Sequence, residues 1–421
     1  MHMRLTRRSL LGAGLFGLGA LALPPRARAA GTTNLIVVFA RGGWDPVWAI
    51  DPKDSPDIDS PADGAKKTFG AAEIPALTSP NRPNIEQFFE AWSDQCAVVR
   101  GIDVGAIAHF GCHVRMMTGT RTELSPDLGM MAAVGQSADL PLPYADIGGG
   151  AYPGLYAAQM GRLGARNQVV TLLNRKKAYD PAASLDYDVT PILTPTAAEA
   201  AQVQAWVDAR AARLADSRAA LGDNARRLAD YRDCFVRADD LRAIPELSNL
   251  VLSGSANLAG QIDLAITLLQ GTSRAVYLDS NLEWDTHDNI ADQGLNHDAL
   301  FGDLAALMQK LSDAGLLANT TVVVMSEMGR TPRLNAPVMA AGKDHWPTTS
   351  AMVLGAGVKP GAYGGTDDRL NARKVDLASG QPKDDGVQLR YDNFAAGVLK
   401  IVGLEPQEWL PDVTPMQGFI A

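Results

Sequence analysis

The chain has 421 residues, 46% of them hydrophobic, and a formal net charge of −9 at pH 7. Residues 1–29 hold five arginines and no acidic residue, so their removal takes the charge to −14. Because an acidic surface repels phosphate backbones and anionic lipid, nucleic acid and membrane surfaces are not expected partners.

The N-terminal segment 1–29 has the features of a bacterial export signal in their usual order: arginines, an uncharged run and a cleavage site. The pair Arg7-Arg8 precedes the uncharged run 9–23, which is too short to span a membrane comfortably. Pro24-Pro25 then breaks the run ahead of a small-x-small cleavage site, so we expect cleavage after Ala29. The paired arginines favour twin-arginine export to the periplasm or medium, without stable membrane insertion after cleavage. A retained N-terminal anchor is the alternative.

Short apolar runs recur along residues 30–421, which we expect to form one domain. They predict buried strands at Asn34–Phe39, Ala97–Val99, Gln168–Leu172, Ala275–Leu278, Thr320–Met325 and Ala351–Leu354. Helical patterns such as Ala256–Leu269 and Asp298–Leu311 separate them. The alternation predicts an α/β protein with a doubly wound, mostly parallel sheet that is covered on both faces.

The segment 194–245 differs from the rest and predicts a helical insertion. It is rich in Ala, Arg and Asp, and it begins with the capping-box pattern Thr196-x-x-Glu199. Apolar residues spaced seven apart then predict a helical hairpin with a bend at Gly222-Asp223. We interpret the apolar stripe as the face that packs on the main domain. A substrate lid or a partner surface is the alternative.

Acidic and histidine side chains gather where the expected strands end, which is where α/β sheets bind ligands. Asp45 follows the first run, Asp285 and His287 follow the fourth, Glu327 follows the fifth, and His345 precedes the last. Oxygen and nitrogen donors together predict a divalent metal, with Zn²⁺ or Mn²⁺ favoured and Ca²⁺ or Mg²⁺ also compatible.

Three segments carry a resemblance to a known family: Asp285-Thr286-His287, Ser326–Pro332 and Gly342–Pro347. With Asp45 they resemble a branch of the alkaline phosphatase and sulfatase superfamily, namely twin-arginine-exported bacterial proteins known mainly as a domain of unknown function. The resemblance implies an alkaline-phosphatase-like fold. It also implies a metal site formed by Asp45, Asp285, His287, Glu327 and His345, with Glu283 as another candidate acid.

Two positions depart from the superfamily pattern. His109 lies ten residues before Gly119, where phosphatases have Ser or Thr and sulfatases a modified Cys. Met328 replaces a histidine that binds a second metal in the superfamily. Because a thioether is a poor ligand for a hard cation, that second site is either rebuilt with His109 or lost. We expect a helix from His109 towards Thr118 that keeps the imidazole neutral. His109 is then a nucleophile, a metal ligand or only a helix cap, and His113 lies on the same face.

Arg330 and Arg121 are the candidates for holding an anionic substrate group, because guanidinium forks match phosphate and sulfate oxygens. Pairing of Arg330 with a neighbouring acid is the alternative. We therefore expect a metal-dependent hydrolase whose substrate is an anionic small-molecule or envelope-derived ester. Since the usual nucleophile and one metal ligand are missing, a non-catalytic, sulfatase-like metal-binding protein with a cell-envelope protein partner is the second hypothesis.

Overall fold

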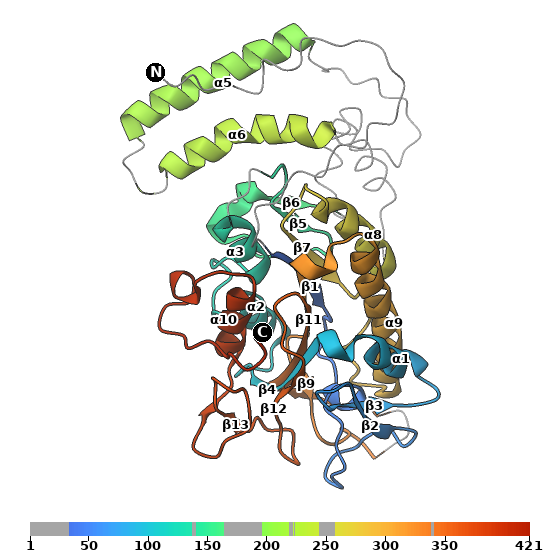
Figure 1. Cartoon of the computed structure of the whole chain (residues 1–421). Coiled ribbons are helices and arrows are strands. Elements are labelled where there is room, and N and C mark those ends of the chain that lie inside the picture. Colours follow the sequence, from blue (N-terminus) through green and yellow to red (C-terminus); the bar gives the residue numbers. More distant parts are fainter. Residues whose placement is uncertain are drawn as a thin grey trace, which may run out of the picture.

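A computed structural model, shown in Figure 1, describes residues 33–136, 140–163, 196–218, 222, 224–243, 257–337 and 341–421. The expected export signal and the strand expected at Gln168–Leu172 lie outside these residues. Within them, no helix is long and apolar enough to cross a membrane.

The central sheet, counted over the described residues, has eight strands in the order β12-β4-β11-β8-β1-β7-β5-β6. Their bounds are β1 Asn34–Phe39, β4 Cys96–Asp103, β5 Tyr144–Asp146, β6 Met160–Arg162, β7 Ala275–Asp279, β8 Thr320–Met325, β11 Thr348–Gly355 and β12 Gly361–Gly364. β11 runs antiparallel to both of its neighbours, β4 and β8, whereas the other adjacent strands pair in parallel. The predicted mostly parallel sheet is confirmed.

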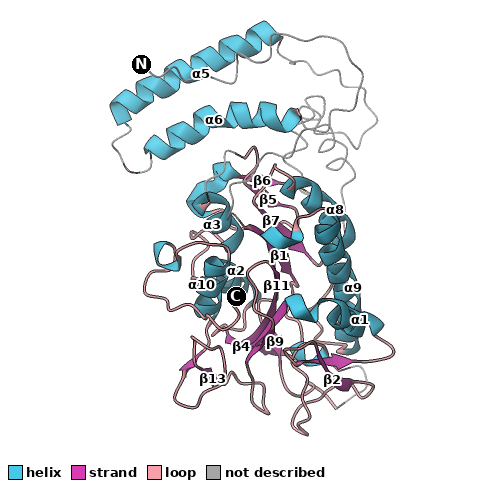
Figure 2. Cartoon of the chain, in the orientation of Figure 1, coloured by secondary structure: helices cyan, strands magenta, loops and turns pink. Residues whose placement is uncertain are grey.

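Helices cover both faces of the sheet, as Figure 2 shows. One face carries α1 (Pro83–Trp92), α8 (Leu258–Leu269) and α9 (Ala291–Asp313), and the other carries α2 (His109–Thr118), α3 (Leu128–Gly135) and α10 (Tyr391–Ile401). In β1, Ile36 and Val38 pack into the first layer while Leu35, Val37 and Phe39 pack into the second. This two-sided burial is why the strands read as continuous apolar runs, and it confirms the doubly wound plan.

Smaller strands pair outside the central sheet. β2 (Ala65–Phe69) pairs with β3 (Ile74–Thr78), and β13 (Lys374–Val375) pairs with β14 (Val387–Gln388). β9 (Gly329–Arg330) pairs with β10 (His345–Trp346), so that Arg330 lies opposite His345. The last pairing matters for function, because it fixes two candidate site residues beside each other.

Two long helices, α5 (Ala197–Arg218) and α6 (Asn224–Arg242), occupy the predicted insertion and stand apart from the sheet in Figure 1. The predicted capping box is present: the Glu199 N–H donates to Thr196 Oγ1 at 3.3 Å, and the Thr196 N–H donates to Glu199 Oε2 at 2.7 Å. α5 packs on α6, and α6 contacts the short helix η4 (Gly154–Gln159) of the main body. The apolar residues spaced seven apart are Val207, Leu214, Leu221, Leu228 and Phe235. Of these, Leu221 lies outside the described residues, as does Asp223 of the expected bend.

Candidate metal centre

The strand ends bring the polar loops together at one edge of the sheet. The loop after β1 lies against the loop after β7, and a Cβ on Gly42 would come within 2.7 Å of the Asp285 backbone nitrogen. Glycine is therefore required at position 42, where φ is also +125°. Because β11 is antiparallel, its first residues lie where the parallel strands end, and this places His345 beside Asp285.

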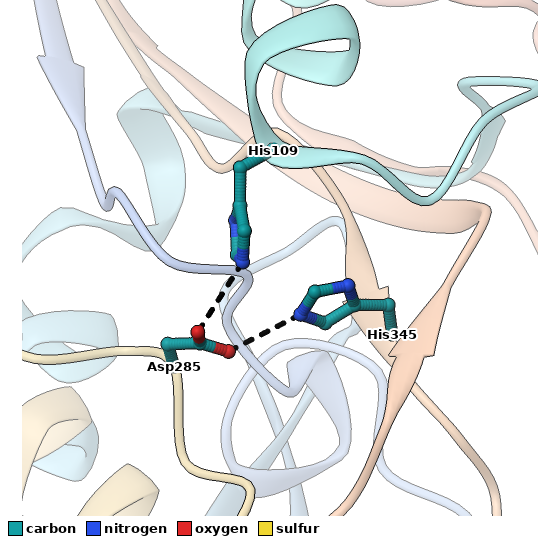
Figure 3. A group of neighbouring side chains, drawn as sticks. All are labelled: His109, Asp285 and His345. Carbon is teal, nitrogen blue, oxygen red and sulfur yellow. Dashed lines mark hydrogen bonds and ion pairs between the residues drawn. The ribbon is translucent and has the colours of Figure 1, made fainter.

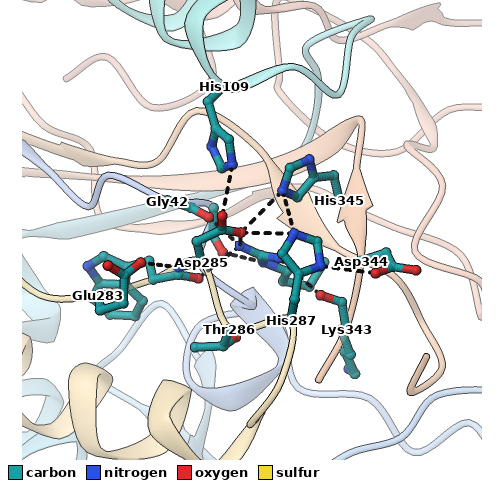
Figure 4. Close-up of polar contacts among 12 residues, drawn as sticks. Gly42, His109, Glu283, Asp285, Thr286, His287, Lys343, Asp344 and His345 are labelled. Atoms are coloured by element: carbon teal, nitrogen blue, oxygen red, sulfur yellow. Dashed lines mark hydrogen bonds and ion pairs between the residues drawn. The ribbon is translucent and has the colours of Figure 1, made fainter. Parts of the chain in front are cut away.

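Four side chains meet at this edge. His109, Asp285 and His345 offer ligand atoms that all lie within 4.8 Å of one another, as Figure 3 shows. His109 Nε2 lies 3.3 Å from Asp285 Oδ2, and His345 Nε2 lies 3.2 Å from Asp285 Oδ1. His287 joins them in Figure 4, with its Nε2 3.1 Å from Asp285 Oδ1. Three imidazole nitrogens thus surround one carboxylate.

The opposite nitrogen of each ring is held by a group that can only accept a hydrogen bond. His109 Nδ1 lies 2.8 Å from Glu327 Oε1, and His287 Nδ1 lies 3.0 Å from Asp344 Oδ1. His345 Nδ1 lies 2.8 Å from the Ile107 carbonyl oxygen. Each Nδ1 must therefore carry the proton, so a neutral ring presents the Nε2 lone pair to the cluster. This orientation is the one that protein carboxylates and carbonyls impose on metal-binding histidines.

These residues fit a divalent cation. Nε2 lone pairs that converge on a carboxylate repel one another unless a positive charge lies among them. Bonds of about 2.0 Å in tetrahedral geometry separate ligand atoms by roughly 3.3 Å. The separations from Asp285 to the three rings are 3.3, 3.2 and 3.1 Å. The donor set and its spacing therefore suit a cation held by His109, Asp285 and His345, with His287 Nε2 beside Asp285 and His345 as a further candidate ligand.

Electrostatics keep the carboxylates of the centre ionised. Burial alone would raise the pKa of Asp285, but the hydrogen bond from Arg330 and the neighbouring His345 and His109 rings lower it to about 2. The hydrogen bond to Glu327 raises the pKa of His109, with Asp285 adding to the effect against burial. The two carboxylates therefore act on the His109 pKa in the opposite direction to the helix start, which favours the neutral ring.

His109 begins α2, as the sequence predicts, and it does not cap that helix. The N-cap residue is Ala108, and no side-chain capping bond forms. Glu327 is fully buried, and its Oε1 also accepts the Gly42 N–H at 2.8 Å. Glu327 contacts the His109 ring rather than the Asp285 carboxylate, so it positions a candidate ligand.

Asp45 lies outside this cluster. Its Oδ2 accepts a hydrogen bond from Lys343 Nζ at 2.7 Å, and both side chains are fully buried. Its Oδ1 accepts the Val47 N–H at 3.2 Å. The structure thus brings together four of the predicted ligand residues and His109, but it gives Asp45 a buried lysine as partner. Glu283 likewise bonds its own loop, at the Asp285 N–H.

Arg330 is a structural clamp in this arrangement. Its side chain is fully buried and donates to the carbonyl oxygens of Gly42, Gly43, Trp284 and Lys343. It also donates to Asp285 Oδ1 at 2.6 Å. The alternative expectation, pairing with an acid, therefore describes Arg330, and its burial makes it unsuited to holding a substrate anion. Arg121 is exposed beyond α2.

A cavity of about 530 Å³ lies beside His109 and Glu327. Arg41, which the sequence reasoning missed, lines this cavity with a side chain that is 47% exposed. Its Nη2 bonds Asp279 Oδ2 at 3.0 Å and Tyr277 Oη at 3.4 Å. Its position in the sequence could have indicated this role, because Arg41 follows β1 almost directly and so lies at a strand end. His113 also lines the cavity and contacts Tyr152 Oη through Nδ1 at 2.7 Å.

Comparison with known proteins supports the resemblance. The family described as protein of unknown function (DUF1501) matches residues 32–409. No curated protein matches the chain.

Similar solved structures include three bacterial proteins. The lipoteichoic acid synthase LtaP from Listeria monocytogenes is 10% identical, with a TM-score of 0.39 over 93% of this chain and 77% of that one. The PsFucS1 sulfatase from Pseudoalteromonas sp. is 10% identical, with a TM-score of 0.37 over 93% and 72%. An alkaline phosphatase from the Antarctic bacterium TAB5 is 10% identical, with a TM-score of 0.38 over 89% and 99%.

Proposed function

The chain belongs to the DUF1501 family, and we propose that it is an exported, metal-dependent hydrolase of phosphate or sulfate esters. One observation carries the proposal: three imidazole Nε2 atoms converge on Asp285 at the edge of a cavity that also holds Arg41. A cation centre beside an anion-binding side chain is the combination that such esters require.

The donor set favours Zn²⁺ or Mn²⁺. Imidazole nitrogen suits these ions, whereas Ca²⁺ and Mg²⁺ prefer oxygen ligands. A divalent cation held by these residues supplies Lewis acidity, which polarises an ester oxygen and acidifies a water molecule. Met328 is fully buried in the core, so it offers no ligand for a second ion. We therefore propose a single cation per chain.

His109 acts as a ligand and not as the nucleophile in this proposal. Its Nδ1 is held by Glu327, and its Nε2 lies 3.3 Å from Asp285 Oδ2, in the position of a ligand to a cation shared with that carboxylate. The attacking group must then come from outside the chain, and water is the candidate.

Arg41 holds the anionic group of the substrate. Asp279 and Tyr277 anchor one end of its guanidinium through Nη2. Over the described residues, its Nε and Nη1 make no hydrogen bond, and they can donate to a phosphate or sulfate oxygen. The pKa of Arg41 is raised, because Tyr277 and Asp279 outweigh burial, so its charge is secure.

A second candidate function is that of a non-catalytic metal-binding protein with a cell-envelope protein partner. The observation that favours it is His109 at the position where the superfamily has a Ser, Thr or modified Cys nucleophile. Both candidates share the metal and the export. They differ only in turnover.

The test uses the chain purified from periplasm. We expect about one zinc or manganese ion per chain by elemental analysis, and metal-dependent turnover within a panel of phosphate and sulfate monoesters and diesters. The variant R41A should keep the metal and lose about 100-fold in kcat/KM, because a charge-assisted contact to the anion is removed. R121A, the matched control, should behave like the unaltered protein. Metal binding without turnover across the panel would favour the non-catalytic alternative.

A further inference from the structure

The cavity beside the metal centre combines charged groups with exposed apolar side chains. Phe110 and Leu124 both line it, and they are 64% and 76% exposed. Single exposed apolar residues are common on protein surfaces. Two that line one cavity next to a charged centre indicate a ligand with an apolar part.

The ionised groups of the cavity balance one another. Arg41 and Arg162 supply two positive charges, and Glu123 and Glu327 supply two negative charges. A cation bound at the centre would therefore be the excess charge, and it would lie at the His109 end. A polyanionic ligand gains little from such a cavity, because the acid Glu123 would repel a second anionic group.

The backbone segments beside Phe110 and Leu124 also shape the cavity. Phe110 follows His109 in the first turn of α2, so the same turn presents a candidate ligand and an apolar side chain to one cavity. Gly149 and Gly150 line the cavity, and a Cβ on Gly150 would lie 2.6 Å from Arg41 Nη2 and 2.3 Å from Tyr277 Oη. A side chain at position 150 would therefore displace Arg41 and Tyr277.

We propose, resting on the hydrolase function above, that the substrates are esters with one anionic group and a large apolar alcohol, either a long alkyl or an aryl group. The anionic group lies between the metal centre and Arg41. The apolar group lies over Phe110 and Leu124. The cavity volume of about 530 Å³ is within the range of sites that enclose a ligand of this size.

The probes are n-alkylphosphonic acids of four to eight carbons, which mimic the ester and cannot be hydrolysed, titrated calorimetrically into the zinc-loaded protein. We expect affinity to rise about two- to fourfold per added methylene. The double variant F110S/L124S should lose this dependence while it keeps the affinity for the shortest probe within about threefold. V387S, which removes another exposed apolar side chain away from the cavity, should keep the dependence.

The variant R41A distinguishes the anion-binding part of the proposed site from the apolar part. It should weaken the binding of probes of all chain lengths by the same factor. Equal affinity for all chain lengths in the unaltered protein would overturn the apolar subsite, and so would an unchanged dependence in F110S/L124S. Chain-length-dependent binding without hydrolysis of any alkyl phosphate or sulfate ester would instead overturn the hydrolase function and leave the subsite standing.

Discussion

The Nε2 atoms of His287 and His345 face each other at 2.9 Å. The second nitrogen of each ring is bound to an oxygen that only accepts, Asp344 Oδ1 for His287 and the Ile107 carbonyl for His345. Two lone pairs at this distance repel, so the pair needs a shared proton or a cation. Asp285 next to both rings makes a metal ion the better solution, because it can bind all three at once.

Asp344 should tune the affinity for the metal through His287. The variant D344N keeps an oxygen acceptor for His287 Nδ1 but removes the negative charge that increases the basicity of the ring. We expect metal affinity to fall by about tenfold, at the low end of the range for such outer partners. Competition with a chelator measures this affinity. D292N, which removes the same charge without a histidine contact, is the control, and equal effects of the two would contradict the assignment.

The variants H109A and H109S distinguish the roles of His109. If His109 is a ligand, both variants should lose most of the bound metal in elemental analysis. The variant E327Q should bind the metal about tenfold more weakly, because the His109 ring is held less firmly. Loss of turnover with the metal retained would instead identify a nucleophile or base. No change in either would refute both roles.

Asp45 should contribute to stability and not to metal binding. The variant D45N leaves Lys343 buried with a neutral partner, and breaking such a pair costs about 3–5 kcal/mol. We expect this loss of stability when the chelator-treated protein is unfolded chemically. The metal content of the untreated D45N protein should equal that of the unaltered protein. The double variant D45N/K343M should be less destabilised than the sum of the single variants, because they share one interaction. A stable D45N protein that lacks metal would show that Asp45 is a ligand.

His297 should make the protein less stable in mild acid. Burial lowers its pKa to about 3, against 6.5 for the exposed side chain, although its Nε2 donates to the Asp45 carbonyl at 3.0 Å. The unfolded state therefore binds the proton more readily, and stability is lost as pH falls from 6.5 towards 3, by about 1.4 kcal/mol per unit.

The variant H297Q removes this titration and can keep the donor to Asp45. Unfolding curves of both proteins with chelator present, between pH 7 and 4.5, give the difference in slope that belongs to His297. His113 contributes a slope of the same sign in both proteins, because burial lowers its pKa to about 4. Parallel slopes for the two proteins would mean that His297 is not buried in its neutral form.

Export should depend on the arginine pair near the N-terminus. Replacement of Arg7 and Arg8 by Lys should leave most of the protein in the cytoplasmic fraction, because twin-arginine export reads this pair. Replacement of Arg26 and Arg28 by Lys is the same charge-conserving exchange away from the pair, and it should not block export. Normal periplasmic levels of the first variant would show that another route is used.

The sequence alone determined the class of fold and most of the site. Buried parallel strands are continuous apolar runs, so β1, β7 and β8 could be located within one residue or so. Parallel strands end at one edge whatever their order in the sheet, and for this reason Asp285, His287 and Glu327 could be expected together before the strand order was known. His109 at the start of α2 was implied by the resemblance to the superfamily, in which a helix starts ten residues before the glycine that Gly119 matches.

Tertiary structure decided what each polar side chain does there. Asp45 and Arg330 lie at the same edge as the ligands, but burial gave Asp45 a lysine partner 298 residues away and surrounded Arg330 with carbonyl oxygens. The short strands β5, β6 and β12 and the reversed direction of β11 also had no sequence signal. The position of a polar residue in the sequence, directly after a strand, indicates that its side chain lies at that edge of the central sheet. Their roles depend on which charges are buried against each other, and that is set by loop paths between residues far apart in the chain.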